Sequence, residues 1–174
     1  WEKLGYQDEL LDVGEPFALW VIESADPEET KRRFALDEAG LAVIFTNNQK
    51  PYRERKVRIL NGAHTAMVPG AFLAGQDIVR DCMHEPTIRK FLDRAVYEEI
   101  LPTVQLPEEE VRAFAASVME RFDNPFIDHA LLSICLNSVS KWKARVLPSL
   151  LDSLAATGKL PQCLTFSFAA LHAS

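Results

Sequence analysis

The pattern of hydrophobic and polar positions changes near residue 50. Before that point, two short runs rich in β-branched and aromatic residues read FALWVIE at 17–23 and LAVIFT at 41–46, with a charged stretch after Asp26-Pro27 between them. This pattern predicts two strands joined by a short helix or turn. Because two strands alone do not make a stable sheet, we expect them to pair with further sequence upstream.

From Pro51 onward, apolar residues recur every three or four positions, which predicts helices throughout. Pro148 predicts a kink or break, and Gly158 suits a left-handed C-terminal cap. An apolar helical run over 164–173 has no capping residue, and position 1 is Trp rather than Met, so we expect a piece of a longer protein. The expected helices cover 51–67, 86–100, 111–122, 127–136 and 139–156.

Composition narrows the functional classes. With 174 residues, 48% of them hydrophobic, the chain can bury one sizeable core. Its net charge of -6 opposes a broad attraction to nucleic acid or to a membrane surface, and no apolar run reaches the roughly 20 residues of a membrane helix. Its three cysteines are far apart and form no CxxC pair, so we expect reduced thiols and a cytoplasmic protein.

Two cofactor motifs are missing from the sequence, and no metal pattern replaces them. No G-x-G-x-x-G occurs, so dinucleotide binding does not follow from this chain alone. Gly70 and Gly75 have the spacing of a phosphate loop, but Gln76-Asp77 stand where Lys and Ser or Thr are required. The four histidines, at 64, 84, 129 and 172, fit no ligand pattern, and we expect no metal.

A basic segment, KPYRERKVR at 50–58, holds five cations and one carboxylate in an otherwise acidic chain. It is either a solvated helix face or a functional site for an anion or an activated lysine. Lys56 lies near the positive end of the expected helix and among three arginines, and both influences favour its neutral amine. Burial would act in the same direction, which makes Lys56 a candidate general base.

Asn61 and His64 follow three residues apart and therefore share a helical face. Polar residues on a helix are usually exposed or satisfied within the fold. Here their neighbours are apolar or small, which predicts a buried stretch whose polar groups need partners. Gly62 and Ala63 also leave room for a ligand.

The spacing K-x4-N-x2-H of Lys56, Asn61 and His64 resembles the signature of the polyol-specific long-chain dehydrogenase/reductase family, which includes the mannitol 2-dehydrogenases. The resemblance implies that Lys56 is the general acid/base and that Asn61 helps form an oxyanion hole around the reacting oxygen. It implies that His64 orients the substrate through hydrogen bonds. Without a metal, a protein side chain must take the alcohol proton, which agrees with a lysine in that role.

Two further segments carry the resemblance. Residues 121–125, RFDNP, resemble the family's RFxNP element, and Lys141 falls where a substrate-contacting lysine is expected. Ser133 stands where mannitol dehydrogenases have a substrate-contacting arginine. The segments 51–65 and 132–148 are similar to the tagaturonate reductases of this family. A sugar-acid carboxylate needs a cation, for which Lys141, Lys143 and Arg145 are the candidates.

The resemblance covers nearly the whole chain and implies a mainly α fold. Residues 51–174 are expected to form a helical substrate-binding domain like the C-terminal domain of 6-phosphogluconate dehydrogenase. Residues 1–50 are expected to be terminal strands of a truncated Rossmann-type domain, the partner that would bind NAD. The implied reaction interconverts D-tagaturonate and D-altronate, and the chain alone is expected to be inactive.

Two alternatives remain beside this reaction. One is a fructuronate/mannonate or hexitol oxidoreductase of the same family, against which Ser133 argues. The other is a helical binding module without catalysis. Dependence of altronate binding on Lys56 and Lys141 would separate the enzyme from the binding module.

Overall fold

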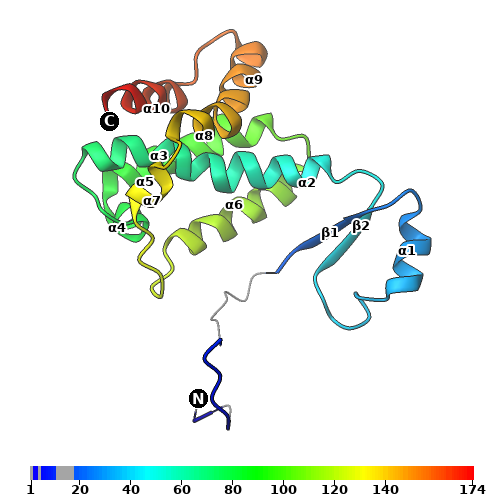
Figure 1. Cartoon of the computed structure of the whole chain (residues 1–174). Helices are drawn as coiled ribbons and strands as arrows, with labels where there is room; N and C mark the ends of the chain where they lie inside the picture. The colour runs from blue at the N-terminus through cyan, green and yellow to red at the C-terminus, as the bar shows by residue number, and fades with distance from the viewer. Residues whose placement is uncertain (1, 4, 11–17) are drawn as a thin grey trace. The chain divides into compact units, whose positions relative to one another are not determined.

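The computed structural model describes residues 2, 3, 5–10 and 18–174, and the chain divides into two compact units, Trp1–Gln49 and Lys50–Ser174. Helices predominate, as the sequence predicts, and the short strands lie in the first unit (Figure 1). No helix in the described part of the chain is long and apolar enough to cross a membrane.

The first unit contains a strand–helix–strand motif. Strand β1 (Trp20–Glu23) pairs in parallel with β2 (Val43–Thr46), so that Trp20 lies opposite Val43. Helix α1 (Pro27–Phe34) connects them, with the Asp26 side chain accepting a hydrogen bond from the Glu29 N–H at its start. The predicted strands and intervening helix are present, although the beginning of the first run lies outside the described residues. Pairing of these strands with further sequence stays a prediction.

The second unit is built around one long helix. This long helix consists of α2 (Lys50–Arg55), a π-helical segment η1 (Lys56–Asn61) and α3 (Gly62–Leu73). The remaining elements, in chain order, are α4 (Val79–His84), α5 (Pro86–Arg94), the π-helix η2 (Ala95–Ile100), the 3₁₀-helix η3 (Leu101–Thr103), α6 (Glu108–Phe122), α7 (Leu131–Cys135), α8 (Ser138–Arg145), α9 (Leu147–Thr157) and α10 (Gln162–Ala173).

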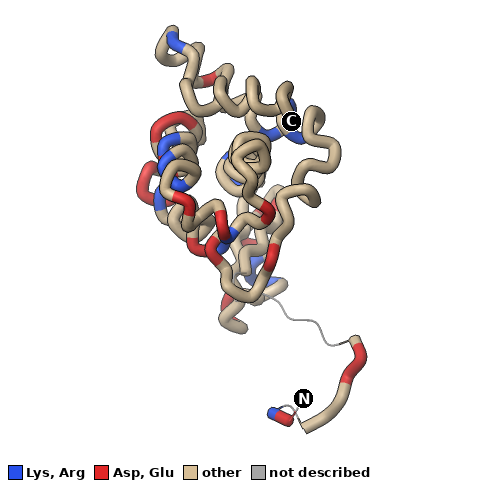
Figure 2. The backbone as a smooth tube through the Cα atoms, turned by 90° about the vertical axis from the view of Figure 1, so that its left-hand side faces the viewer, with Lys and Arg blue, Asp and Glu red and all other residues tan. Residues whose placement is uncertain are grey.

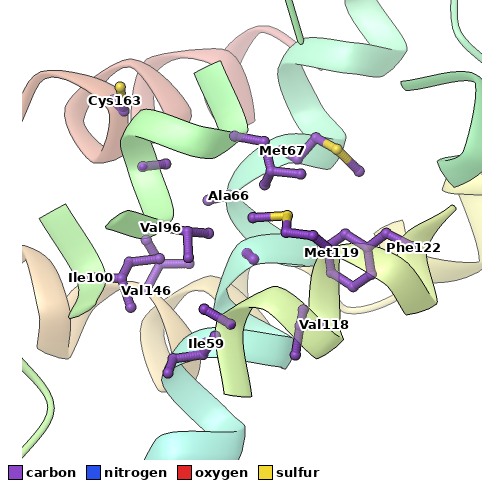
Figure 3. Packing of buried hydrophobic residues seen from close by; sticks show 14 of the residues in the cluster. Ile59, Ala66, Met67, Val96, Ile100, Val118, Met119, Phe122, Val146 and Cys163 are labelled. Carbon is purple, nitrogen blue, oxygen red and sulfur yellow. The ribbon is translucent and has the colours of Figure 1, made fainter. Parts of the chain in front are cut away.

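The hydrophobic core surrounds η1 and α3. Ile59, Ala63 and Met67 on this helix are at most 1% exposed. They are covered by residues of η2, α6 and the chain between α8 and α9, among them Val96, Ile100, Val118 and Val146 (Figure 3). The burial predicted for the apolar neighbours of Asn61 and His64 is therefore present. In contrast, basic and acidic residues alternate along outer helices (Figure 2).

Some predicted helix bounds differ from the structure. The first helix extends beyond Met67 to Leu73 and tolerates Pro69 inside it, because tertiary packing buries Val68, Pro69 and Ala71. The 139–156 helix is broken at Val146, which the predicted effect of Pro148 anticipated. Gly158 has the expected left-handed conformation, with φ of 67°.

The prediction of a helix over 127–136 is wrong for its first half, since only Leu131–Cys135 is helical. The backbone of 129–131 pairs instead with that of 77–79. The Val79 N–H donates to the His129 carbonyl at 3.0 Å, and the Leu131 N–H donates to the Asp77 carbonyl at 2.8 Å. These long-range hydrogen bonds replace the local ones of a helix and fix the loop before α7.

Candidate functional site

The π-helical segment η1 begins at Lys56 and ends at Asn61. The Gly62 N–H reaches back five residues to the Val57 carbonyl, in the manner of a π-helix. The wider turn changes the angular spacing between Lys56 and Asn61 from that of a regular α-helix, and such segments are frequent at functional sites. His64 follows in the first turn of α3.

The three residues differ in their access to solvent. Lys56 is exposed within this chain, so the burial that would add to its activation is not present here. Asn61 and His64 are half-buried. The His64 Nε2 atom is buried and has no hydrogen-bond partner among the described residues, so its hydrogen-bonding capacity is unsatisfied within them.

Two cations of the basic segment, Arg55 and Arg58, have a structural role. Arg55 is buried, pairs with Glu110 of α6 and lies with its guanidinium carbon 4.5 Å from the centre of the Phe114 ring. Arg58 pairs with Asp152 of α9. Lys56, by comparison, forms no ion pair with any described residue. The segment is thus an anchor for α6 and α9 that leaves the Lys56 ammonium unpaired.

The His64 imidazole is held between two rings. It stacks on Phe122 with centroids 3.8 Å apart and an interplanar angle of 8°, while His129 contacts it edge-on at 5.3 Å. Burial lowers the pKa of His64 from 6.5 to about 3. The neighbouring His129, Arg121 and Arg145 act in the same direction. His64 is therefore a neutral hydrogen-bonding group at neutral pH.

The RFDNP segment shapes one side of this environment. Phe122 is the last residue of α6, and Asn124 then turns the chain by accepting the Phe126 N–H at its Oδ1, 2.9 Å away. Ser133 is exposed on α7, and its hydroxyl donates to the Ala130 carbonyl at 2.7 Å.

The three candidate carboxylate ligands occupy different environments on α8. Arg145 is half-buried, and its Nη1 lies 3.4 Å from the Thr65 Oγ1, next to His64. Gly62 permits this proximity, because a Cβ there would lie 3.0 Å from the Arg145 carbonyl oxygen. Lys141 donates from Nζ to the Ile134 carbonyl at 2.9 Å. Lys143 is exposed and, two residues from Arg145, lies on another face of α8.

The sequence did not identify His129 and Phe122 as neighbours of His64. The spacing of the histidines along the sequence tests only for metal-binding patterns. It does not reveal the contact of His129 with His64, because that contact depends on tertiary packing. No cluster of three or more His, Cys, Asp or Glu side chains suited to a metal occurs among the residues described.

The strand–helix–strand motif does not fit the phosphates of a dinucleotide. A pyrophosphate binds at a helix N-terminus after a strand, where backbone N–H groups are free and the helix dipole favours negative charge. At the start of α1, the Asp26 carboxylate already accepts the Glu29 N–H, and Glu28 and Glu29 add negative charge. A dinucleotide would have to be held by other residues.

Comparisons with known proteins identify the family of this chain. Residues 48–173 match the family model described as the mannitol dehydrogenase C-terminal domain. The altronate oxidoreductase of Shigella flexneri is 49% identical over 172 residues, and that of Enterobacter sp. (strain 638) is 48% identical over 171 residues. These alignments cover 99% and 98% of this chain but 35% of each relative, so the chain spans about a third of their length.

Solved structures show the same fold. The ternary complex of Pseudomonas fluorescens mannitol 2-dehydrogenase with NAD and D-mannitol is 26% identical, with a TM-score of 0.71 over 90% of this chain and 31% of that one. A substrate-free D-sorbitol dehydrogenase is 20% identical, with a TM-score of 0.69 over 78% of this chain and 28% of that one. The chain therefore belongs to the mannitol dehydrogenase C-terminal domain family, within a group of dehydrogenases and reductases.

Proposed function

We propose that this chain is the substrate-binding part of a nicotinamide-dependent oxidoreductase that interconverts D-tagaturonate and D-altronate. The observation that carries the proposal is the unpaired Lys56 ammonium on the same long helix as Asn61 and the unsatisfied His64 Nε2. The identity of 48–49% to proteins named altronate oxidoreductase supports the choice of substrate. The sugar-acid specificity is part of the proposal.

The complete enzyme in this proposal has a Rossmann-type domain to which residues 1–50 contribute terminal strands. The curated relatives are about three times as long as the matched region, which leaves length for such a domain. NAD is assigned to the part of that domain outside this chain, because the α1 N-terminus is unsuited to phosphates. We propose a cytoplasmic enzyme, for which the three free cysteines are suited. "Full-length enzyme" below means this chain joined to that domain.

The proposed chemistry at the substrate oxygen uses three side chains. Lys56 protonates the nascent alkoxide in reduction and accepts the hydroxyl proton in oxidation. Asn61 donates a hydrogen bond to the same oxygen as negative charge develops there, an interaction worth about 3 kcal/mol when well placed. The neutral His64 imidazole holds a substrate hydroxyl through Nε2. Hydride chemistry belongs to the nicotinamide when it is bound.

The substrate carboxylate is assigned to the cations of α8. Arg145 is favoured because it lies beside Thr65, next to His64 in the chain. Lys141 remains a candidate, since an ammonium has three N–H donors and the Ile134 carbonyl occupies one. Lys143, exposed on another face, is the weakest of the three.

A substrate panel tests this proposal. The full-length enzyme is assayed with NAD and D-altronate, D-mannonate, D-mannitol and D-altritol, the last being altronate with a CH2OH in place of the carboxylate. We expect the largest kcat/KM for altronate. A preference for mannonate or a hexitol would transfer the assignment to another substrate of the family. Binding of these sugars without any turnover would favour a non-catalytic module.

A further inference from the structure

The environment of His64 is electropositive although the chain as a whole is acidic. The guanidinium groups of Arg121 and Arg145 act on its imidazole, as does His129, while the net charge of the chain is -6. These groups come from three separate segments: the end of α6, the loop before α7 and the end of α8. A local concentration of positive groups favours an anionic ligand at this place.

The backbone at His129 is held by hydrogen bonds, whereas its imidazole forms none with the described residues. Its carbonyl accepts the Val79 N–H at 3.0 Å, and the bond from Leu131 to Asp77 restrains the chain two residues later. The imidazole is exposed and contacts His64 edge-on, with the centroids 5.3 Å apart. Its ring nitrogens have no hydrogen-bond partner within the described part of the chain. The loop thus presents a free donor beside His64.

Two other polar groups near this loop are already engaged. The Ser133 hydroxyl donates to the Ala130 carbonyl at 2.7 Å, and the Lys141 ammonium donates to the Ile134 carbonyl at 2.9 Å. Both bonds stabilise the short helix α7 and its ends. Among the side chains of this loop and of α7, His129 therefore offers an uncommitted donor beside His64, which adds to the cations of α8.

We infer that His129 is a substrate-contacting residue that binds the carboxylate of an acidic sugar next to His64, while the other end of the sugar reacts at Lys56. The inference rests on the proposed function and adds a specificity-determining residue to it. An α-helix rises about 1.5 Å per residue and a wider π-helical turn rises less, which places the backbones at 56 and 64 at most about 12 Å apart. An extended sugar acid, approached by side chains at both ends, suits such a separation.

A charge series at position 129 tests the inference in the full-length enzyme. The measured quantity is the ratio of kcat/KM for tagaturonate to kcat/KM for tagatose, the neutral ketose with CH2OH in place of the carboxylate. His129→Gln should lower this ratio about tenfold, since a hydrogen bond to a charged group is lost or weakened. His129→Asp should lower it further by repulsion, and His129→Arg should restore it.

His172→Gln is the matched control, because His172 is an exposed histidine on α10 whose Nδ1 lies 2.9 Å from the Phe168 carbonyl oxygen. The His172→Gln variant should have the same ratio of kcat/KM for tagaturonate to kcat/KM for tagatose as the unchanged enzyme. A ratio that stays constant across the Gln and Asp variants at position 129 would overturn the inference. Equal losses for both ketoses would overturn it too, because they would assign His129 to the fold or to a neutral hydroxyl.

The two proposals fail in different ways. If the unchanged enzyme reduced neither ketose, the proposed function would be wrong, and the inference would be decided by binding. The ring signals of His129 in the 174-residue chain would then be followed by NMR during titration with altronate and with altritol. A shift of the His129 ring signals with altronate but not with altritol supports a carboxylate site. No shift with either ligand, or an equal shift with both, rejects it.

Discussion

The imidazole of His64 lies flat against the ring of Phe122, with centroids 3.8 Å apart and the planes inclined by 8°. The contact joins α3 to the end of α6, and it fixes the plane in which the unsatisfied Nε2 of His64 lies. Phe122 is 4% exposed and therefore belongs to the hydrophobic core, and it also orients His64 in the proposed site.

Truncation of Phe122 should affect stability and substrate binding. Phe122→Ala is expected to lower the free energy of unfolding by about 3–5 kcal/mol, because it leaves a cavity in the core. Phe122→Leu should cost less stability but still raise KM, since it removes the flat surface that orients His64. Denaturant unfolding and steady-state kinetics measure both effects. Phe126, which is 92% exposed, is the control, and Phe126→Ala should leave the unfolding free energy nearly unchanged.

Burial of His64 predicts a specific dependence of stability on pH. Its pKa is about 3 in the folded chain against 6.5 when free, so between these values the unfolded chain binds a proton that the folded chain does not. The stabilisation is complete above pH 6.5 and is lost as pH falls toward 3, by on the order of a few kcal/mol.

The comparison with His64→Gln isolates this contribution, because other titrating groups remain in both proteins. Unfolding free energies between pH 3.5 and 7 should fall more steeply on acidification for the unchanged chain than for the variant. Parallel curves would contradict the lowered pKa.

Sequence patterns predicted those parts of the fold that depend on local structure. The β-branched runs, Asp26-Pro27 and Gly158 all act within a few residues of themselves, and the strands, α1 and the left-handed cap are found there. The stretch before α7 could not be predicted this way, because its hydrogen bonds are to residues 77–79. The π-helical turn at Lys56–Asn61 has no recognised sequence signal either.

The candidate site also has a part that local sequence predicts and a part that depends on tertiary packing. Lys56, Asn61 and His64 could be grouped from sequence because one helix carries them all. From sequence, the family resemblance favoured Lys141 over the other two cations of α8. The structure distinguishes Arg145 instead, through the packing of α8 against Gly62 and Thr65. The contact between His64 and His129 likewise depends on tertiary packing.

Arg55 should be needed for stability, unlike its exposed neighbour Arg53. Glu110→Gln leaves the buried Arg55 guanidinium without its charge partner and is expected to lower the unfolding free energy by about 1–3 kcal/mol. Arg53→Ala should change it by less than about 0.5 kcal/mol, because Arg53 is exposed. Equal effects of the two substitutions would show that the ion pair does not hold α2 against α6.

The proposed function depends on proton transfer by Lys56, which kcat of Lys56→Ala in the full-length enzyme measures. We expect a decrease of about 10²- to 10⁴-fold, with KM for NADH largely unchanged and partial recovery of the rate on adding a small primary amine. Lys90→Met, at an exposed lysine on α5, should leave kcat unchanged. A decrease of less than about tenfold for Lys56→Ala would show that Lys56 is not the general acid/base.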